Sequence, residues 1–98
     1  MAVAYYNTFP AATPEMAKQV SEYVNQQIGT QAPSGGIYHA EGPLDDGGWW
    51  AFDVWESTET AEQFYAAILT PALQHANLAQ PETRIMSVEW QTNAQPGG

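Results

Sequence analysis

Two side chains near the middle of the chain have the types that acid–base chemistry needs. His39 lies in the segment GIYHAEGP, and Asp53 lies in the segment GGWWAFDVWES. The neighbours of Asp53 are strongly apolar and comprise Trp49, Trp50, Phe52, Val54 and Trp55. Because an ionised carboxylate is costly to bury, Asp53 needs either water or a polar partner.

The two segments are predicted to form an antiparallel hairpin, since the turn-forming sequence PLDDG joins them. Strand alternation then puts Ile37, His39 and Glu41 on one face. We expect position 39 to pair near position 51, which makes Asp53 the diagonal neighbour of His39 on that face. An aspartate that accepts from one imidazole nitrogen fixes the tautomer, raises the basicity of the ring and leaves the other nitrogen free. The His39–Asp53 pair is therefore a candidate general base, or alternatively only a stabiliser of the sheet or of a dimer interface.

A second set of polar and aromatic side chains is expected to bind a small molecule between the sheet and the helices. Asn7 is a polar residue within an apolar strand, where it can position an enol, phenol or peroxide oxygen or simply bond to a nearby loop. His75 follows Pro71 by four residues and can equally face solvent. The full set consists of Tyr5, Asn7, Tyr23, Trp49, Trp55, Phe64, Tyr65 and His75.

Metal and nucleophile chemistry has little support in the sequence. His39, Glu41 and Asp53 are suitable ligand types, but the HxH and HExxH spacings are absent, so we predict no metal site. The chain has no cysteine, which excludes disulfides, thiolate catalysis and cysteine-based zinc or iron–sulfur sites. No phosphate loop, Rossmann fingerprint or serine-nucleophile motif occurs.

Hydrophobic periodicity and turn residues predict four strands and two helical regions in one domain, residues 1–91, followed by a flexible tail, 92–98. Thr13 caps the first helix and Gly29 ends it, and Ser57 starts the second helical region. Pro71 should interrupt that region, so that Thr70 caps a separate short helix. The predicted strands are 3–9, 36–42, 48–56 and 82–90, and the predicted helices are 14–28, 58–69 and 71–79.

This βαββαβ order predicts an α+β fold of the ferredoxin-like type, with four antiparallel strands and helices on one face. The third strand carries aromatic residues toward both sides, Trp50, Phe52 and Val54 on one and Trp49, Ala51 and Trp55 on the other. The face without helices would leave an apolar patch in water. We therefore expect a homodimer in which the two sheets face each other.

The charge balance restricts the possible partners. Eleven acidic residues stand against two basic ones, Lys18 and Arg84, which gives a net charge of −9. Binding to nucleic acid or to anionic lipid needs clustered cations, so neither partner is expected. The start of the chain lacks the features of a signal peptide, no apolar run is long enough for a membrane span, and we expect a cytoplasmic location.

The chain resembles the dimeric α/β-barrel superfamily, in particular its short bacterial antibiotic-biosynthesis-monooxygenase-like members. The resemblance covers residues 3–90 and is carried by GIYHAEGP, by GGWWAFDVWES and by ILTPAL near the end of the second helix. It implies a dimeric α/β barrel and an enzyme of secondary metabolism. The implied chemistry is a cofactor-independent monooxygenation of an aromatic or polyketide-like molecule, for which the His39–Asp53 pair is the candidate base.

Three alternatives stay open on this scaffold: a cyclase or isomerase, a non-catalytic dimeric binding protein, and a haem-binding or haem-degrading protein. In haem-degrading relatives, an asparagine, an aromatic residue and a histidine line the pocket, and Asn7, Phe64 and His75 occupy similar places. Here the aromatic residue is Phe64 where a tryptophan is expected, and the chain has almost no cations for the haem propionates.

Overall fold

The computed structural model describes residues 1–90, and the predicted tail at 92–98 lies outside the described residues. The order of elements is the predicted one, except that the second helical region has three parts. The elements are β1 (Val3–Phe9), α1 (Pro14–Ile28), β2 (Gly36–Pro43), β3 (Trp49–Trp55), α2 (Thr58–Phe64), η1 (Tyr65–Leu69), α3 (Thr70–His75) and β4 (Glu82–Ser87).

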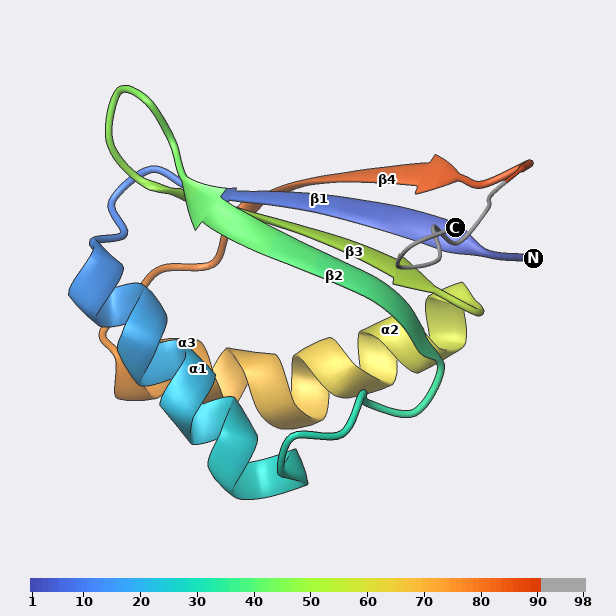
Figure 1. Cartoon of the computed structure of the whole chain (residues 1–98), viewed down its shortest axis with the longest axis horizontal. Coiled ribbons are helices and arrows are strands. Elements are labelled where there is room, and N and C mark those ends of the chain that lie inside the picture. The colour runs from blue at the N-terminus through green and yellow to red at the C-terminus, as the bar shows by residue number, and fades with distance from the viewer. Residues whose placement is uncertain (91–98) are drawn as a thin grey trace, which may run out of the picture.

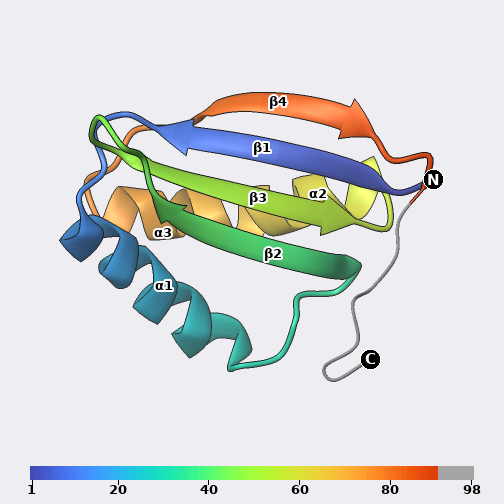
Figure 2. The same ribbon diagram turned by 45° about the horizontal axis from the view of Figure 1, so that its top comes forward.

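The four strands form one antiparallel sheet in the order β2-β3-β1-β4. All the helices cover the same face of this sheet, as Figure 1 shows, and Figure 2 shows α1 beneath β2 with α2 and α3 running along the other strands. This arrangement confirms the predicted ferredoxin-like α+β fold.

Helix α1 begins and ends as its sequence predicts. The Thr13 side chain accepts a hydrogen bond from the Met16 amide at 3.2 Å, and Pro14 occupies the first turn. Gly29 adopts a φ of 70° and donates its amide to the Asn25 carbonyl at 2.8 Å. No residue of α1 is fully buried, because its apolar stripe borders a cavity instead of packing tightly on the sheet.

The prediction of a separate helix capped by Thr70 is wrong. Thr70 and Leu69 both have right-handed helical backbone, and no side chain caps the start of α3. The helix instead continues through a π-helical turn, in which the Thr70 amide bonds to the carbonyl of Tyr65. A proline ring clashes with the carbonyl four residues before it in a regular α-helix. The wider turn just before Pro71 accommodates the ring without breaking the helix.

The strand boundaries differ from the prediction at the hairpin and at the C-terminal end. Pro43 belongs to β2, and Gly48 belongs to the turn, so β3 starts at Trp49. Strand β4 ends at Ser87 and not at residue 90, because Ser87 pairs with Val3, the first residue of β1. Beyond that pair, β1 offers no further strand residue for the ladder.

Two buried apolar clusters lie on the helix-covered face of the sheet, toward opposite ends of the β1–β3 pair. One contains Val3, Tyr5, Trp55 and Ala61, and the other contains Phe9, Ala12 and Leu73. Two buried polar side chains, Asn7 and Asp53, come from the middle of the same two strands. The polar centre of the sheet is therefore enclosed between two apolar ends.

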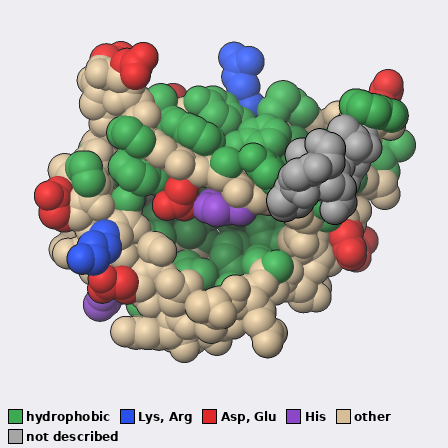
Figure 3. Space-filling view, viewed as in Figure 1, with side chains coloured by type: hydrophobic (Ala, Val, Ile, Leu, Met, Phe, Trp, Pro, Cys, Tyr) green, Lys and Arg blue, Asp and Glu red, His purple; other side chains and the backbone are tan. Residues whose placement is uncertain are grey.

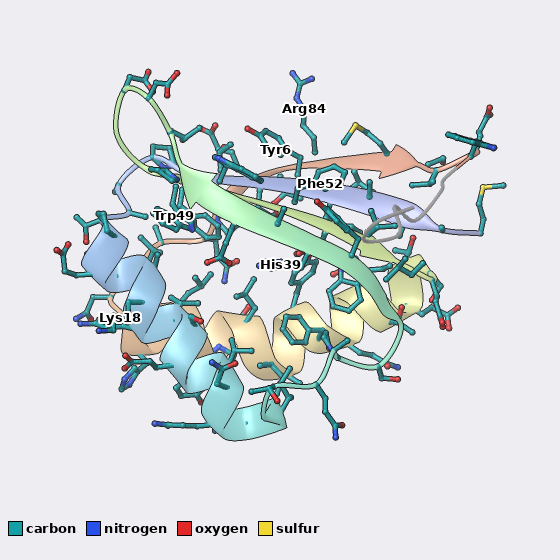
Figure 4. The ribbon with its side chains drawn as sticks, in the orientation of Figure 1. Tyr6, Lys18, His39, Trp49, Phe52 and Arg84 are labelled. Carbon is teal, nitrogen blue, oxygen red and sulfur yellow. The ribbon has the colours of Figure 1, made fainter. Side chains whose placement is uncertain are left out.

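The helices of residues 1–90 leave the opposite face of the sheet uncovered (Figure 1). Tyr6 and Phe52 lie on this side, away from the helices, and Arg84 projects from it (Figure 4). Tyr38 and Met86 on the same face are 56% and 44% exposed.

Among residues 1–90, no helix combines the length and the apolar character that crossing a bilayer requires.

The β2–β3 turn offers a test of the fold, because its two adjacent glycines differ in their surroundings. Gly47 and Gly48 have φ values of 99° and 98°. A Cβ on Gly47 would meet no atom within 4 Å, whereas one on Gly48 would lie 2.7 Å from the Phe9 carbonyl oxygen. We expect Gly47→Ala to lower the free energy of unfolding by about 1–3 kcal/mol. Gly48→Ala should cost roughly 1–3 kcal/mol more, through the clash.

Urea unfolding of the two variants measures this difference directly. Gly47→Ala serves as the matched control, because it carries the same backbone strain without the clash. Equal stability of the two variants would contradict the close approach of the turn to the end of β1.

Candidate functional site

His39 and Asp53 lie directly opposite each other on β2 and β3. The predicted diagonal relationship is therefore wrong in register, because Pro43 pairs with Trp49 and the turn comprises residues 44–48. The predicted partnership is present: Nδ1 of His39 and Oδ1 of Asp53 form a hydrogen bond. Both side chains lie on the helix-covered face, and His39 points toward the helices in Figure 4.

Asp53 is buried at 8% exposure, and both of its carboxylate oxygens have partners. Oδ2 accepts a hydrogen bond of 2.7 Å from the Tyr65 hydroxyl. That hydroxyl in turn accepts one of 3.1 Å from Nε1 of Trp55. A chain of hydrogen bonds thus runs from the apolar core to His39, and it explains how an aspartate is accommodated among tryptophans.

The second ring nitrogen of His39 is also occupied. Oε2 of Glu41 lies 2.7 Å from Nε2, so the expectation that this nitrogen is free is wrong. Two carboxylates on one imidazole favour the form in which both nitrogens carry a proton. The bonds to Asp53 and then to Glu41 raise the pKa of His39 to about 10, against the opposing effect of partial burial. His39 is therefore an imidazolium at neutral pH.

This charge has a consequence for stability. The folded-state pKa lies above the value near 6.5 of free histidine, so the charged form favours the folded state. The stabilisation of the folded state by the charged imidazolium is complete below about pH 6.5 and is lost as the pH rises through about 10. Because the His39 side chain is 55% exposed, solvent screening keeps it small.

Tyr65 comes from the π-helical turn and donates to Asp53. Burial, and then the neighbouring charge of Asp53 and the bond to it, raise the pKa of Tyr65, while hydrogen bonds from Trp55 and Asn7 act in the opposite direction. The hydroxyl therefore keeps its proton over the physiological range and remains a donor to Asp53.

A cavity of about 470 Å³ separates α1 from the sheet, and His39 and Glu41 lie at its edge. Figure 3 shows it as a hollow lined with hydrophobic side chains, with a histidine beside an acidic side chain. Its volume is in the range of small-molecule sites. The apolar wall includes Val20, Val24, Ile28, Ile37, Leu69 and Leu73.

The structure brings half of the predicted binding set to this cavity. Trp49, Trp55, Phe64 and Tyr65 line it together with His39 and Asp53. The ring of Trp55 lies 5.2 Å from that of Phe64 and 5.6 Å from that of Tyr65, measured between centroids. These three aromatic rings form one wall of the site.

The other four predicted residues do not line the cavity. Tyr5 is buried and donates to Glu62 at 2.7 Å, and burial followed by this bond raises its pKa to about 12. Asn7 is buried and accepts from Thr83 at 2.6 Å. Tyr23 and His75 contact each other, with ring centroids 5.4 Å apart.

The site does not fit haem. His75 lies outside the cavity lining, and both nitrogens of His39 are bonded to carboxylates, so neither histidine is placed to ligate iron there. Neither Lys18 nor Arg84 lines the cavity to meet propionates. Within residues 1–90, no group of three histidine, aspartate or glutamate side chains has the arrangement of a metal site.

Sequence reasoning missed two partnerships. The bond between Glu41 and His39 could have been predicted from the sequence, because residues two apart in a strand share a face. The bond between Tyr65 and Asp53 could not have been predicted, because it depends on how a π-helical turn directs one tyrosine toward the sheet.

Comparison with solved structures identifies the fold. SnoaB from Streptomyces nogalater, described as a cofactor-independent oxygenase, superposes with a TM-score of 0.67 at 16% identity, over 92% of this chain and 95% of that one. The fold is that of SnoaB. A candidate antibiotic biosynthesis monooxygenase from Chloroflexus aurantiacus gives 0.67 at 12% identity, over 95% and 98% of the two chains. Rv0793 from Mycobacterium tuberculosis gives 0.68 at 12% identity, over 95% and 100%.

These structural neighbours confirm the resemblance to antibiotic-biosynthesis-monooxygenase-like proteins at the level of the fold. No protein-family model matches the sequence, and no curated protein matches it.

The titration of His39 tests the electrostatics of the site. We expect Asp53→Asn to lower the pKa of His39, because it removes the carboxylate with the largest effect, and Glu41→Gln to lower it less. NMR titration of the imidazole signals measures both shifts, and His75→Gln assigns the signals of the two histidines. An unchanged His39 titration in Asp53→Asn would show that the two side chains do not interact.

Proposed function

We propose that this protein is a small-molecule enzyme that oxygenates an aromatic or polyketide-like compound without a dedicated cofactor. One observation carries the proposal: an apolar cavity of about 470 Å³ has the His39 imidazolium at its edge and aromatic rings along one wall. Flat apolar molecules suit such a lining, and the cationic ring of His39 supplies a polar contact that orients them.

The fold supports the same reaction class. SnoaB, which shares the fold, is described as a cofactor-independent oxygenase. That description agrees with the expectation that no cofactor is needed here. The structural similarity extends over 92% of this chain and 95% of SnoaB.

The chemistry begins with the loss of a proton from the substrate. His39 is already protonated, so its contribution is to stabilise the resulting anion, while a carboxylate at the rim or water takes the proton. Asp53 holds the ring and its charge in place, so the pair acts as a cationic anchor and not as the general base that the sequence predicted. The electron-rich anion then reacts with O₂: an activated CH₂ group and O₂ give a ketone and water, with electrons supplied by the substrate.

A non-catalytic binding protein is the second candidate. The observation that favours it is the full occupancy of both imidazole nitrogens, which leaves His39 without a lone pair to accept a proton. A cyclase or isomerase would share the first step, stabilisation of the substrate anion, and would not consume O₂.

Oxygen uptake with a hydroxylated anthrone distinguishes these functions, because its CH₂ group becomes a quinone carbonyl. We expect His39→Gln and Asp53→Asn each to lower the rate by at least about tenfold. The double variant should lose less than the product of the two effects, because the residues act as one unit. Asp46→Asn, an exposed carboxylate in the β2–β3 turn, is the matched control and should retain the rate.

Oxygen uptake that survives in both His39→Gln and Asp53→Asn would contradict the assigned site. Melting temperatures of all variants separate lost chemistry from lost folding. Conversion of the probe without oxygen uptake would favour the cyclase or isomerase.

We further propose a homodimer in which the uncovered faces of two sheets meet. The support is the apolar character of that face, where Tyr38 is 56% exposed and packs edge-on against Phe52 with a centroid distance of 6.3 Å. A patch of this kind on a small chain is typical of an interface.

Light scattering should give twice the chain mass of 10.7 kDa at micromolar concentration. Phe52→Lys, which places a charge in the centre of this face, should shift the protein toward the monomer. Ala66→Lys adds the same charge on an exposed helix position and should leave the dimer intact. A wild-type protein that stays monomeric would contradict the proposal.

A further inference from the structure

The Glu41 carboxylate occupies the second ring nitrogen of His39. Nε2 is the ring nitrogen of His39 that faces away from Asp53, and the Glu41 carboxylate lies 2.7 Å from it at the edge of the cavity. We infer that Glu41 is a displaceable occupant, and that the cavity selects apolar molecules carrying one acidic oxygen, which replaces the Glu41 carboxylate on His39. This inference rests on the proposed function and specifies its substrate class.

The two carboxylates on His39 differ in how firmly they are held. The Asp53 side chain is 11% exposed, comes from an interior strand and also binds Tyr65. The Glu41 side chain is 38% exposed and comes from the edge strand β2, and among residues 1–90 its hydrogen-bond partner is His39. Exposed ion pairs contribute little stability, so an anion that also buries apolar surface can take the place of Glu41 but not that of Asp53.

The charges around the cavity limit the ligand to one acidic group. His39 is the cationic side chain of the described lining, which contains neither lysine nor arginine. Lys18 lies elsewhere, on α1, with a side chain 78% exposed and 4.0 Å from Glu22. A second anionic group on the ligand would therefore meet Asp53 and Glu41 without a cation to balance it.

The exchange also accounts for the proton. When a phenol or enol replaces Glu41, its O–H bond breaks, its oxygen accepts the Nε2–H bond as an anion, and its proton passes to the departing carboxylate. Glu41 then releases that proton to solvent, since its side chain is partly exposed. Glu41 thus serves both as the competitor of the ligand and as the acceptor of its proton.

Binding of two matched probes tests the inference without turnover. Naphthalene-2-carboxylate carries the acidic oxygen, and 2-methylnaphthalene has a similar shape without it. Quenching of tryptophan fluorescence reports binding, because Trp49 and Trp55 line the cavity. We expect Glu41→Gln to bind the carboxylate probe about fivefold more tightly than the wild type, because the competing anion is gone. The affinity for 2-methylnaphthalene should stay unchanged.

Glu82→Gln is the matched control, because it removes the same charge from an exposed position on β4. It should change neither affinity, which separates exchange at His39 from a general reduction of the net charge. Glu41→Ala, which cannot accept from Nε2 at all, should give the same gain as Glu41→Gln. His39→Gln should abolish the preference for the carboxylate probe.

The inference is overturned if Glu41→Gln leaves the carboxylate probe unchanged or weaker, if both probes gain equally, or if neither probe binds. Its failure is distinguishable from that of the proposed function. A fivefold gain together with no oxidation of the anthrone would support the exchange and contradict the oxygenase. Oxidation of the anthrone with no effect of Glu41→Gln on binding of the carboxylate probe would support the oxygenase and contradict the exchange.

Discussion

The buried carboxylate of Asp53 is the constraint on which the site depends. An aspartate at 8% exposure has to be matched by donors, and here one oxygen meets His39 and the other meets Tyr65. These two hydrogen bonds hold the His39 imidazole on one side of Asp53 and the π-helical turn, through Tyr65, on the other. It also fixes the charge of His39, because a buried anion favours a cation at its partner. The cationic character of the cavity edge therefore originates from an acidic residue in the sheet.

Backbone geometry places these groups within reach of one another. The pairing of Pro43 with Trp49 sets the register of the hairpin, and that register puts His39 opposite Asp53. A shift of one residue would send His39 to the uncovered face. On the helical side, the π-helical turn that precedes Pro71 begins at Tyr65, the residue that reaches Asp53.

Much of this arrangement was predictable from local sequence patterns. The bounds of β1 and α1 follow from alternation, from the Thr13 cap and from Gly29, and these signals act over a few residues. The partnership of His39 with Asp53 was predictable because strand faces are determined by parity, and the predicted pairing was wrong by two residues, which leaves the parity unchanged. The continuous helix through Pro71 was not predictable, since propensity rules describe a proline as a break and do not report how a helix widens before it. The Tyr65–Asp53 bond was not predictable either, because Tyr65 lies in that wider turn.

The half-exposed stripe of α1 has a consequence for the energetics of the whole domain. A helix of a small protein ordinarily places its apolar residues in close contact with the sheet, whereas here part of that surface borders the cavity. The side chains of α1 that face the cavity therefore lack some of the van der Waals contacts that close packing would give them. A bound molecule would supply the missing atoms and become the last part of the hydrophobic core. Ligand binding would then add to conformational stability, by about 2.7 kcal/mol at a ligand concentration of 100 times Kd.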